Sequence, residues 1–120
     1  TNQVGPLMKS LLLTVLLLTS ILLPFSSVSA DTVRMMGAGN VTCKEWSQSR
    51  ISMEYFSAGN WILGFLSATA WSTGDDILNG KKADILFSAI DEFCTKMPEL
   101  TIAEAAVELA SHMLDKTSSE

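Results

Sequence analysis

The sequence predicts an all-α protein: a small four-helix orthogonal bundle held by one disulfide. The stretch 55–74 contains no Asp, Glu, Lys or Arg, and its inner part is apolar or small on every side at helical spacing. Segments on both sides of it repeat apolar residues every three or four positions. The chain has two cysteines, Cys43 and Cys94, which lie far apart in the sequence. We expect helix 55–74 to be the central helix, enclosed by the others.

Residues 1–30 are expected to be upstream sequence followed by a secretory signal peptide. Lys9 provides the positive n-region, 11–23 the short apolar core, and Val28-Ser29-Ala30 the small-residue cleavage site. We predict cleavage after Ala30, export to the periplasm and no stable membrane insertion afterwards. The alternative is an uncleaved anchor, but the run 11–23 is shorter than the about 20 residues that a span needs.

An oxidising compartment favours a Cys43–Cys94 disulfide. It would close a loop of about 50 residues and contribute about 4 kcal/mol in the chain-entropy model. Metal binding is the competing use of cysteine, but two cysteines and His112 include no close pair at ligand spacing. We therefore predict no metal and no cofactor.

The charge of the chain bears on its partners. After Ala30, seven basic residues stand against 13 acidic ones. Nucleic acids and anionic membranes require clustered basic residues, so neither is an expected partner. An acidic surface suits a basic protein partner.

Segment 31–41 shows no period and is expected to be a flexible leader before a helical domain over 42–116. Thr42 and Glu45 form the first capping box, and the inner stripe of that helix is expected at Cys43, Trp46, Arg50 and Met53. The Arg50 head group is expected to reach outside. Gly59-Asn60 is expected to end this helix and to begin the uncharged one, in which Gly64 would allow close helix packing.

Segment 72–82 is the longest polar connection of the domain, with turn-forming residues at Gly74, Asn79 and Gly80. Loops carry binding more often than packed faces do. It is therefore the leading candidate for partner contact, against the alternative of a solvated linker. The residues proposed for contact are Asp75, Asp76, Asn79 and Lys81.

The third helix is predicted over 83–97, ended by Pro98, and the fourth begins at Thr101 with a capping box to Glu104. Residues 117–120 are expected to fray. The predicted core residues outside the cysteines are Trp46, Trp61, Gly64, Phe65, Leu66, Leu86, Ile90, Phe93 and Leu109.

The predicted disulfide constrains the topology. Its Cα atoms must lie within about 7 Å. Parallel first and third helices would place these ends roughly 20 Å apart. We therefore expect the first and third helices to run antiparallel or to cross steeply, clamped across helix 55–74.

No catalytic residues are predicted. A thiol triad of either cysteine with His112 and Asp115 would need a free cysteine in an oxidising compartment. Asp75 and Asp76 are adjacent, and nothing places them across a cleft as in glycosidases.

A family resemblance adds to this interpretation. The segments Thr42-Cys43-Lys44-Glu45-Trp46, Trp61 to Ala68 and Asp91-Glu92-Phe93-Cys94, with Pro98 and Ile102 to Ala106, resemble the Rap/Tai family of small periplasmic immunity proteins. Those proteins guard bacteria against peptidoglycan amidases delivered by type VI secretion. The layout is also similar to the Hde acid-stress chaperones, which are secreted, helical and held by a single disulfide.

The Rap/Tai resemblance implies a homodimeric helical protein that blocks an amidase active site by protein–protein contact and has no chemistry of its own. The Hde resemblance implies a chaperone that binds unfolded clients after acid-triggered dissociation. A third possibility is an envelope protein of the same fold with another partner.

Overall fold

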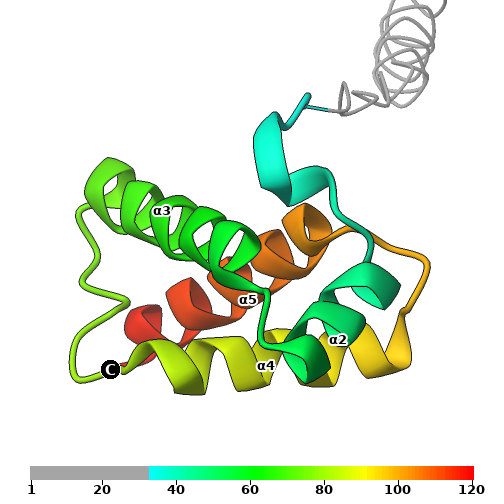
Figure 1. Ribbon diagram of the computed structural model, residues 1–120. Helices are drawn as coiled ribbons and strands as arrows, with labels where there is room; N and C mark the ends of the chain where they lie inside the picture. The colour runs from blue at the N-terminus through cyan, green and yellow to red at the C-terminus, as the bar shows by residue number, and fades with distance from the viewer. Residues whose placement is uncertain (1–32) are drawn as a thin grey trace, which may run out of the picture. The chain divides into compact units, whose positions relative to one another are not determined.

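The computed structural model describes residues 33–120, which form one 3-10 helix and four α-helices (Figure 1). These are η1 (Gly37–Asn40), α2 (Cys43–Ser52), α3 (Phe56–Thr73), α4 (Ala83–Lys96) and α5 (Ile102–Ser118). The predicted all-α, disulfide-held orthogonal bundle is confirmed. The predicted signal peptide and its cleavage site after Ala30 lie outside the described residues. Within 33–120, no helix has the length and apolar character needed to cross a membrane.

The central helix is α5, and the expectation that 55–74 would be central is wrong. α5 lies against α3, α4 and η1, whereas α2 packs on α4 at one end of the molecule (Figure 1). Small residues explain how α5 can take this place. Ala103, Ala105, Ala106 and Ala110 are all buried, so neighbouring helices approach it closely from several sides.

The uncharged helix α3 buries only one of its faces. Ala58, Gly59, Ile62 and Leu66 face the core, whereas Gly64 is exposed and the Trp71 side chain is 89% exposed. The absence of charge along 55–74 therefore does not reflect burial on every side. A Cβ atom at Gly64 would meet nothing within 4 Å, so this glycine does not serve helix packing inside the chain.

The close approach expected at Gly64 occurs instead at Gly59. A Cβ atom at Gly59 would come within 2.9 Å of the Phe87 ring, so the glycine makes room for an aromatic side chain of α4. Gly59-Asn60 thus lies inside α3 and does not separate two helices. The break occurs at Met53, which adopts the left-handed conformation (φ 63°) after α2 ends at Ser52.

α2 and α4 run antiparallel in direct contact. Cys43 and Cys94 form the disulfide with their Cα atoms 4.8 Å apart, and Trp46, one turn into α2, meets Asp91, one turn before Cys94. The antiparallel prediction is confirmed. The two helices are not clamped across α3, however, because nothing separates them.

The N-termini of α2 and α5 are joined. Both predicted capping boxes are present, Thr42 with Glu45 and Thr101 with Glu104, and the two threonines form a β-bridge. The Cys43 amide donates to the Leu100 carbonyl at 2.7 Å, which satisfies one of the helix-end donors. The turn between α4 and α5 thereby holds the start of α2.

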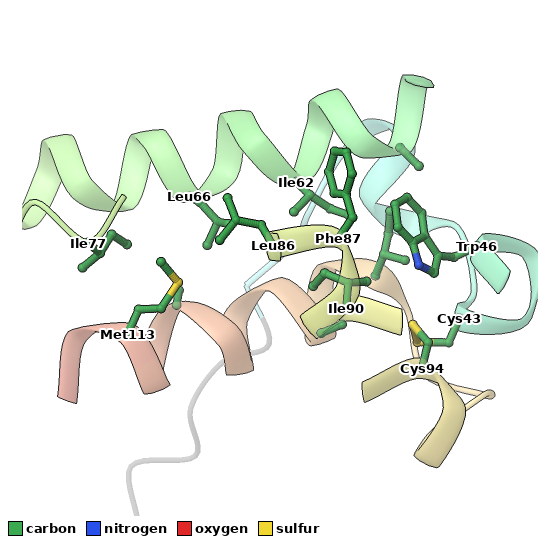
Figure 2. Close-up of a cluster of buried hydrophobic side chains, with 14 residues drawn as sticks. Cys43, Trp46, Ile62, Leu66, Ile77, Leu86, Phe87, Ile90, Cys94 and Met113 are labelled. Atoms are coloured by element: carbon green, nitrogen blue, oxygen red, sulfur yellow. A yellow bond between two sulfur atoms is a disulfide. The ribbon is translucent and has the colours of Figure 1, made fainter. Parts of the chain in front are cut away.

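The core lies between α3, α4 and α5 and ends at the disulfide (Figure 2). Of the predicted core residues, Trp46, Leu66, Leu86 and Ile90 are buried, as are both cysteines. Four others are only partly buried and pack on the rim of the core: Trp61, Phe65, Phe93 and Leu109. Gly64 is the one predicted core residue that lies on the surface. Phe87 and Ile77 are buried core residues that the sequence patterns did not single out.

The segment expected as a flexible leader contains structure. Over Gly37–Asn40 it forms η1, where Gly39 is buried against the indole of Trp61. The Trp61 Nε1 atom also donates to the Met36 carbonyl at 2.8 Å. At the other end α5 continues to Ser118, two residues beyond the predicted end of the domain.

Candidate partner-binding groove between α4 and α5

The loop between α3 and α4 is folded onto the core by one side chain. Gly74 ends α3 in the left-handed conformation (φ 74°), which glycine adopts without steric cost. Short turns follow, with the Ile77 amide bonded to the Asp75 carbonyl and the Asn79 amide to the Asp76 carbonyl. Ile77 is only 2% exposed and fixes the loop, so the polar residues around it are held at the surface.

A groove of about 420 Å³ lies between this loop, the first half of α4 and the last half of α5. We refer to it as the α4–α5 groove. Its floor is apolar and consists of Ile77, Ile85, Leu86, Ala89, Leu109 and Met113. Its rim carries amide, imidazole and charged groups from Asp76, Asn79, Lys81, His112, Lys116 and Glu120.

The groove continues along both helices. A second hollow of about 340 Å³ shares Ala89, Leu109 and His112 with the first and extends to Phe93 and Lys96. Leu109 and Phe93, predicted as core, therefore have one side toward the core and the other toward this surface. Together the two hollows follow most of the length of α4.

The structure brings together three of the four residues predicted for partner contact. Asp76, Asn79 and Lys81 line the α4–α5 groove, whereas Asp75 is exposed beside it and does not line it. Sequence reasoning missed His112 and Lys116 as members of the same rim. Their positions one turn apart on the polar side of the last helix gave no indication that the 75–81 loop would return to α5.

The charged groups of the loop are free to meet a partner. Among residues 33–120 the ion pairs are Arg50–Asp91 and Lys96–Glu92, so Asp75, Asp76 and Lys81 have none there. All three side chains are exposed. The α4–α5 groove can therefore present an apolar floor together with carboxylate, amide and ammonium groups.

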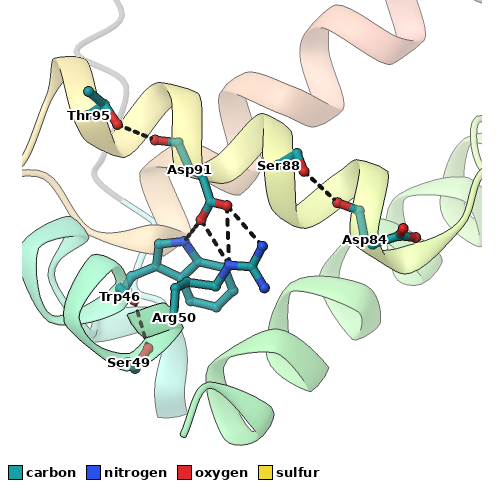
Figure 3. Close-up of polar contacts among 7 residues, drawn as sticks. All are labelled: Trp46, Ser49, Arg50, Asp84, Ser88, Asp91 and Thr95. Carbon is teal, nitrogen blue, oxygen red and sulfur yellow. Dashed lines mark hydrogen bonds and ion pairs between the residues drawn. The ribbon is translucent and has the colours of Figure 1, made fainter. Parts of the chain in front are cut away.

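A second polar cluster joins α2 to α4 (Figure 3). The Trp46 Nε1 atom donates to Asp91 Oδ1 at 2.7 Å, and Arg50 donates to the same carboxylate through Nε and Nη2. The expectation that the Arg50 head reaches outside is wrong, because Asp91 holds it against the neighbouring helix. The bond to Asp91 raises the pKa of the Arg50 guanidinium above its ordinary value.

Aromatic rings surround the Arg50 guanidinium on its other side. Its central carbon lies 4.6 Å from the Tyr55 ring centre and 5.8 Å from that of Phe87. These distances are those of cation–π contacts. Because Arg50 itself occupies the aromatic cluster, we interpret the cluster as the joint between α2 and α4.

The cysteines and acids support no further site in the described residues. Both thiols are consumed in the Cys43–Cys94 disulfide, which removes the nucleophile from the triad considered with His112 and Asp115. Within 33–120 no group of three His, Cys, Asp or Glu side chains is placed to hold a metal ion.

Comparison of the chain with family models, curated proteins and solved structures gives no match in any of the three.

Proposed function

We propose that the protein is a periplasmic immunity-type binding protein that blocks a peptidoglycan amidase by protein–protein contact through the α4–α5 groove and its 75–81 rim. The observation that carries the proposal is the groove itself. It has an apolar floor and a rim of unpaired charges, and three of its rim residues belong to the loop that the sequence singled out. The amidase as partner rests on the Rap/Tai resemblance.

The loop is suited to entering the cleft of an enzyme. Ile77 anchors it to the core, so it loses little conformational freedom on binding, which favours affinity. Asp75 and Asp76 project two adjacent carboxylates at its start. Such a pair complements a cationic cleft. The apolar floor of the α4–α5 groove can pack against apolar side chains at the edge of the same cleft.

The test is capture of the partner from periplasm at neutral pH, followed by an amidase assay with the captured enzyme. We expect one amidase to be retained and inhibited. The double variant Asp75→Asn/Asp76→Asn should weaken inhibition by at least about tenfold, because charge-assisted contacts to a basic cleft are lost.

The matched control is Glu99→Gln, an exposed carboxylate in the turn after α4 and far along the chain from the loop. It should inhibit like the unmodified protein. Retention of no amidase, or equal losses for the control and the double variant, would overturn the proposal.

The alternative function is an acid-activated chaperone of the Hde type. One observation favours it: carboxylates make three structural contacts in the fold. Asp91 connects α2 to α4, and Glu45 and Glu104 cap the N-termini of α2 and α5. Of these, the Glu45 carboxylate has its pKa lowered by hydrogen bonds from Thr42, so its contribution to the start of α2 is lost as the pH falls through that lowered value. Capture of many unfolded proteins only in acid, with none at neutral pH, would establish this function in place of immunity.

A further inference from the structure

Two apolar rows face each other across the α4–α5 groove and its continuation toward Phe93. Both rows repeat every four residues: Ile85, Ala89 and Phe93 on α4, and Ala105, Leu109 and Met113 on α5. As the lining advances along α4 toward Lys96, the residues opposite it go back along α5, so the two helices run side by side in opposite directions (Figure 1). Ile85 is 58% exposed, and Phe93 and Leu109 are only partly buried. The rows therefore leave large apolar side chains in contact with water.

The spacing of the rows fits a third helix. Side chains four residues apart form the ridges by which helices pack into one another's grooves. Two such ridges side by side leave a hollow into which the ridge of another helix can fit. From Ile85 to Lys96 the lining of α4 extends over about 16 Å, which is about three turns of a helix lying along it.

The walls of the groove also favour a helix over an extended segment. Both walls are α-helices, so their backbone amides and carbonyls are already bonded within α4 and α5. An extended segment laid between them would lose water from its own backbone groups and would find few replacement partners. A helix satisfies its backbone groups internally and presents only side chains to the groove.

Glu108 gives the groove an anionic group at the Phe93 end. Glu92 and Lys96, which line the same hollow, pair with each other at 3.2 Å. Glu108 is exposed and has no ion pair among residues 33–120. At the other end the charges of the rim balance, since two are acidic and two are basic: Asp76, Glu120, Lys81 and Lys116. A cationic residue of an occupant is therefore best placed over Glu108.

From these rows and this charge we infer that the α4–α5 groove binds a basic amphipathic helix of the partner, about three turns long, with its apolar stripe between α4 and α5 and a lysine or arginine over Glu108. The inference rests on the proposed function in taking the groove as the partner-binding surface, and it adds the chemistry of the segment that binds there. The 75–81 loop, at one end of the groove, stays free to enter the cleft of the enzyme.

The test uses a fluorescein-labelled synthetic peptide of about 14 residues, made of leucine, alanine, glutamine and lysine, with leucine at helical spacing and lysine at one end. A scrambled peptide of the same composition lacks the apolar stripe. Fluorescence anisotropy with the purified protein measures both dissociation constants. We expect a value below about 100 µM for the amphipathic peptide, at least about tenfold lower than for the scrambled one. Because so short a helix is marginal in water, circular dichroism should show a gain of helix on binding.

Two substitutions locate the peptide in the groove. Ala89→Arg places a long side chain where the two hollows meet and should weaken binding at least about tenfold. The matched control is Ser88→Arg, at an exposed neighbouring position outside the lining, which should bind like the unmodified protein. Glu108→Lys should reverse the preference for the lysine peptide over the same peptide with glutamate in place of lysine. Asp115→Lys, an equal change of charge on α5 outside the lining, should not reverse it.

Equal binding of the amphipathic and scrambled peptides, binding unaffected by Ala89→Arg, or a charge preference unchanged by Glu108→Lys would overturn the inference. Amidase capture, measured separately, distinguishes this failure from failure of the proposed function. No peptide binding, together with amidase inhibition that depends on Asp75 and Asp76, would overturn the inference and leave the proposed function standing. Peptide binding without retention of an amidase would overturn the proposed function and leave the groove as a site for a helix of another partner.

Discussion

At the scale of single residues, the glycines of α3 have opposite roles. Gly59 lies against Phe87, whereas Gly64 faces open space. A glycine inside a helix costs about 1 kcal/mol relative to alanine, and at Gly64 nothing within the monomer offsets that cost. Substituting each glycine by alanine should therefore change the free energy of unfolding in opposite directions.

We expect Gly64→Ala to raise the free energy of unfolding of the monomer by about 0.5–1 kcal/mol. Gly59→Ala gains the same helix propensity but crowds the Phe87 ring, and overpacking costs about 1–3 kcal/mol. Urea denaturation at dilute concentration measures both. Equal effects of the two substitutions would contradict the contact at Gly59.

Asp91 is the carboxylate on which the α2–α4 joint depends. Asp91→Ala leaves the Trp46 indole and the Arg50 guanidinium without their acceptor, and we expect a loss of about 1–3 kcal/mol. Its side chain is 37% exposed, so solvent moderates the loss. Glu92→Ala, which removes the neighbouring exposed pair with Lys96, should cost under about 0.5 kcal/mol. Chemical denaturation measures the free energy of unfolding of both variants, and equal losses would contradict the role given to Asp91.

The Glu45 carboxylate gives the stability a dependence on pH. Hydrogen bonds from the Thr42 backbone and hydroxyl lower the pKa of Glu45 below its ordinary value of 4.5. A lowered pKa means that the contribution is present above the unfolded-state value and is lost as the pH falls through the folded-state value. The stability difference between the protein and Glu45→Gln should therefore be larger at pH 7 than at pH 3. Thermal unfolding at both values measures it, and an unchanged difference would contradict the assignment.

At the scale of elements, the sequence predicted the helix caps and the disulfide, whereas it misplaced the break between α2 and α3. Both capping boxes form as predicted because a cap depends on residues three positions apart. The end of α2 at Met53 was missed, because a methionine in the left-handed conformation has no sequence signature. Gly59 was taken for a helix break because the Phe87 ring that requires it comes from another helix.

The candidate site was predictable only in part for the same reason. Turn-forming residues indicated the 75–81 loop, but its return to α5 depends on the burial of Ile77, which no periodic pattern contained. The absence of charge along 55–74 was interpreted as burial on every side. In the structure half of that helix is exposed, so the absence of charge does not by itself indicate burial.

The Cys43–Cys94 disulfide links α2 covalently to α4. It joins residues 51 positions apart, and closing a loop of that length contributes about 4 kcal/mol in the chain-entropy model. Total stability is typically about 5–15 kcal/mol, so Cys43→Ala/Cys94→Ala should unfold at much lower urea concentration. The Trp46–Asp91 contact should still dock α2 in the folded fraction. A loss below about 1 kcal/mol would show that this polar joint alone holds the helix.

At the scale of the whole molecule, the α4–α5 groove is lined by the first half of α4, whereas the disulfide joins α2 to the last turn of α4. The α4–α5 groove is rimmed by charges of both signs that form no ion pair within residues 33–120. The disulfide and the joined helix N-termini stabilise the end of the molecule where α2 packs, away from the 75–81 loop in the chain.

The central claim is that the partner binds at the α4–α5 groove. Amide hydrogen exchange of the protein, free and with its captured partner, tests it most directly. We predict slower exchange in the complex over 75–81 and the last two turns of α5, with little change in α2. Protection confined to α2 or to the turn at Met53, with the 75–81 loop exchanging as fast as in the free protein, would contradict the claim.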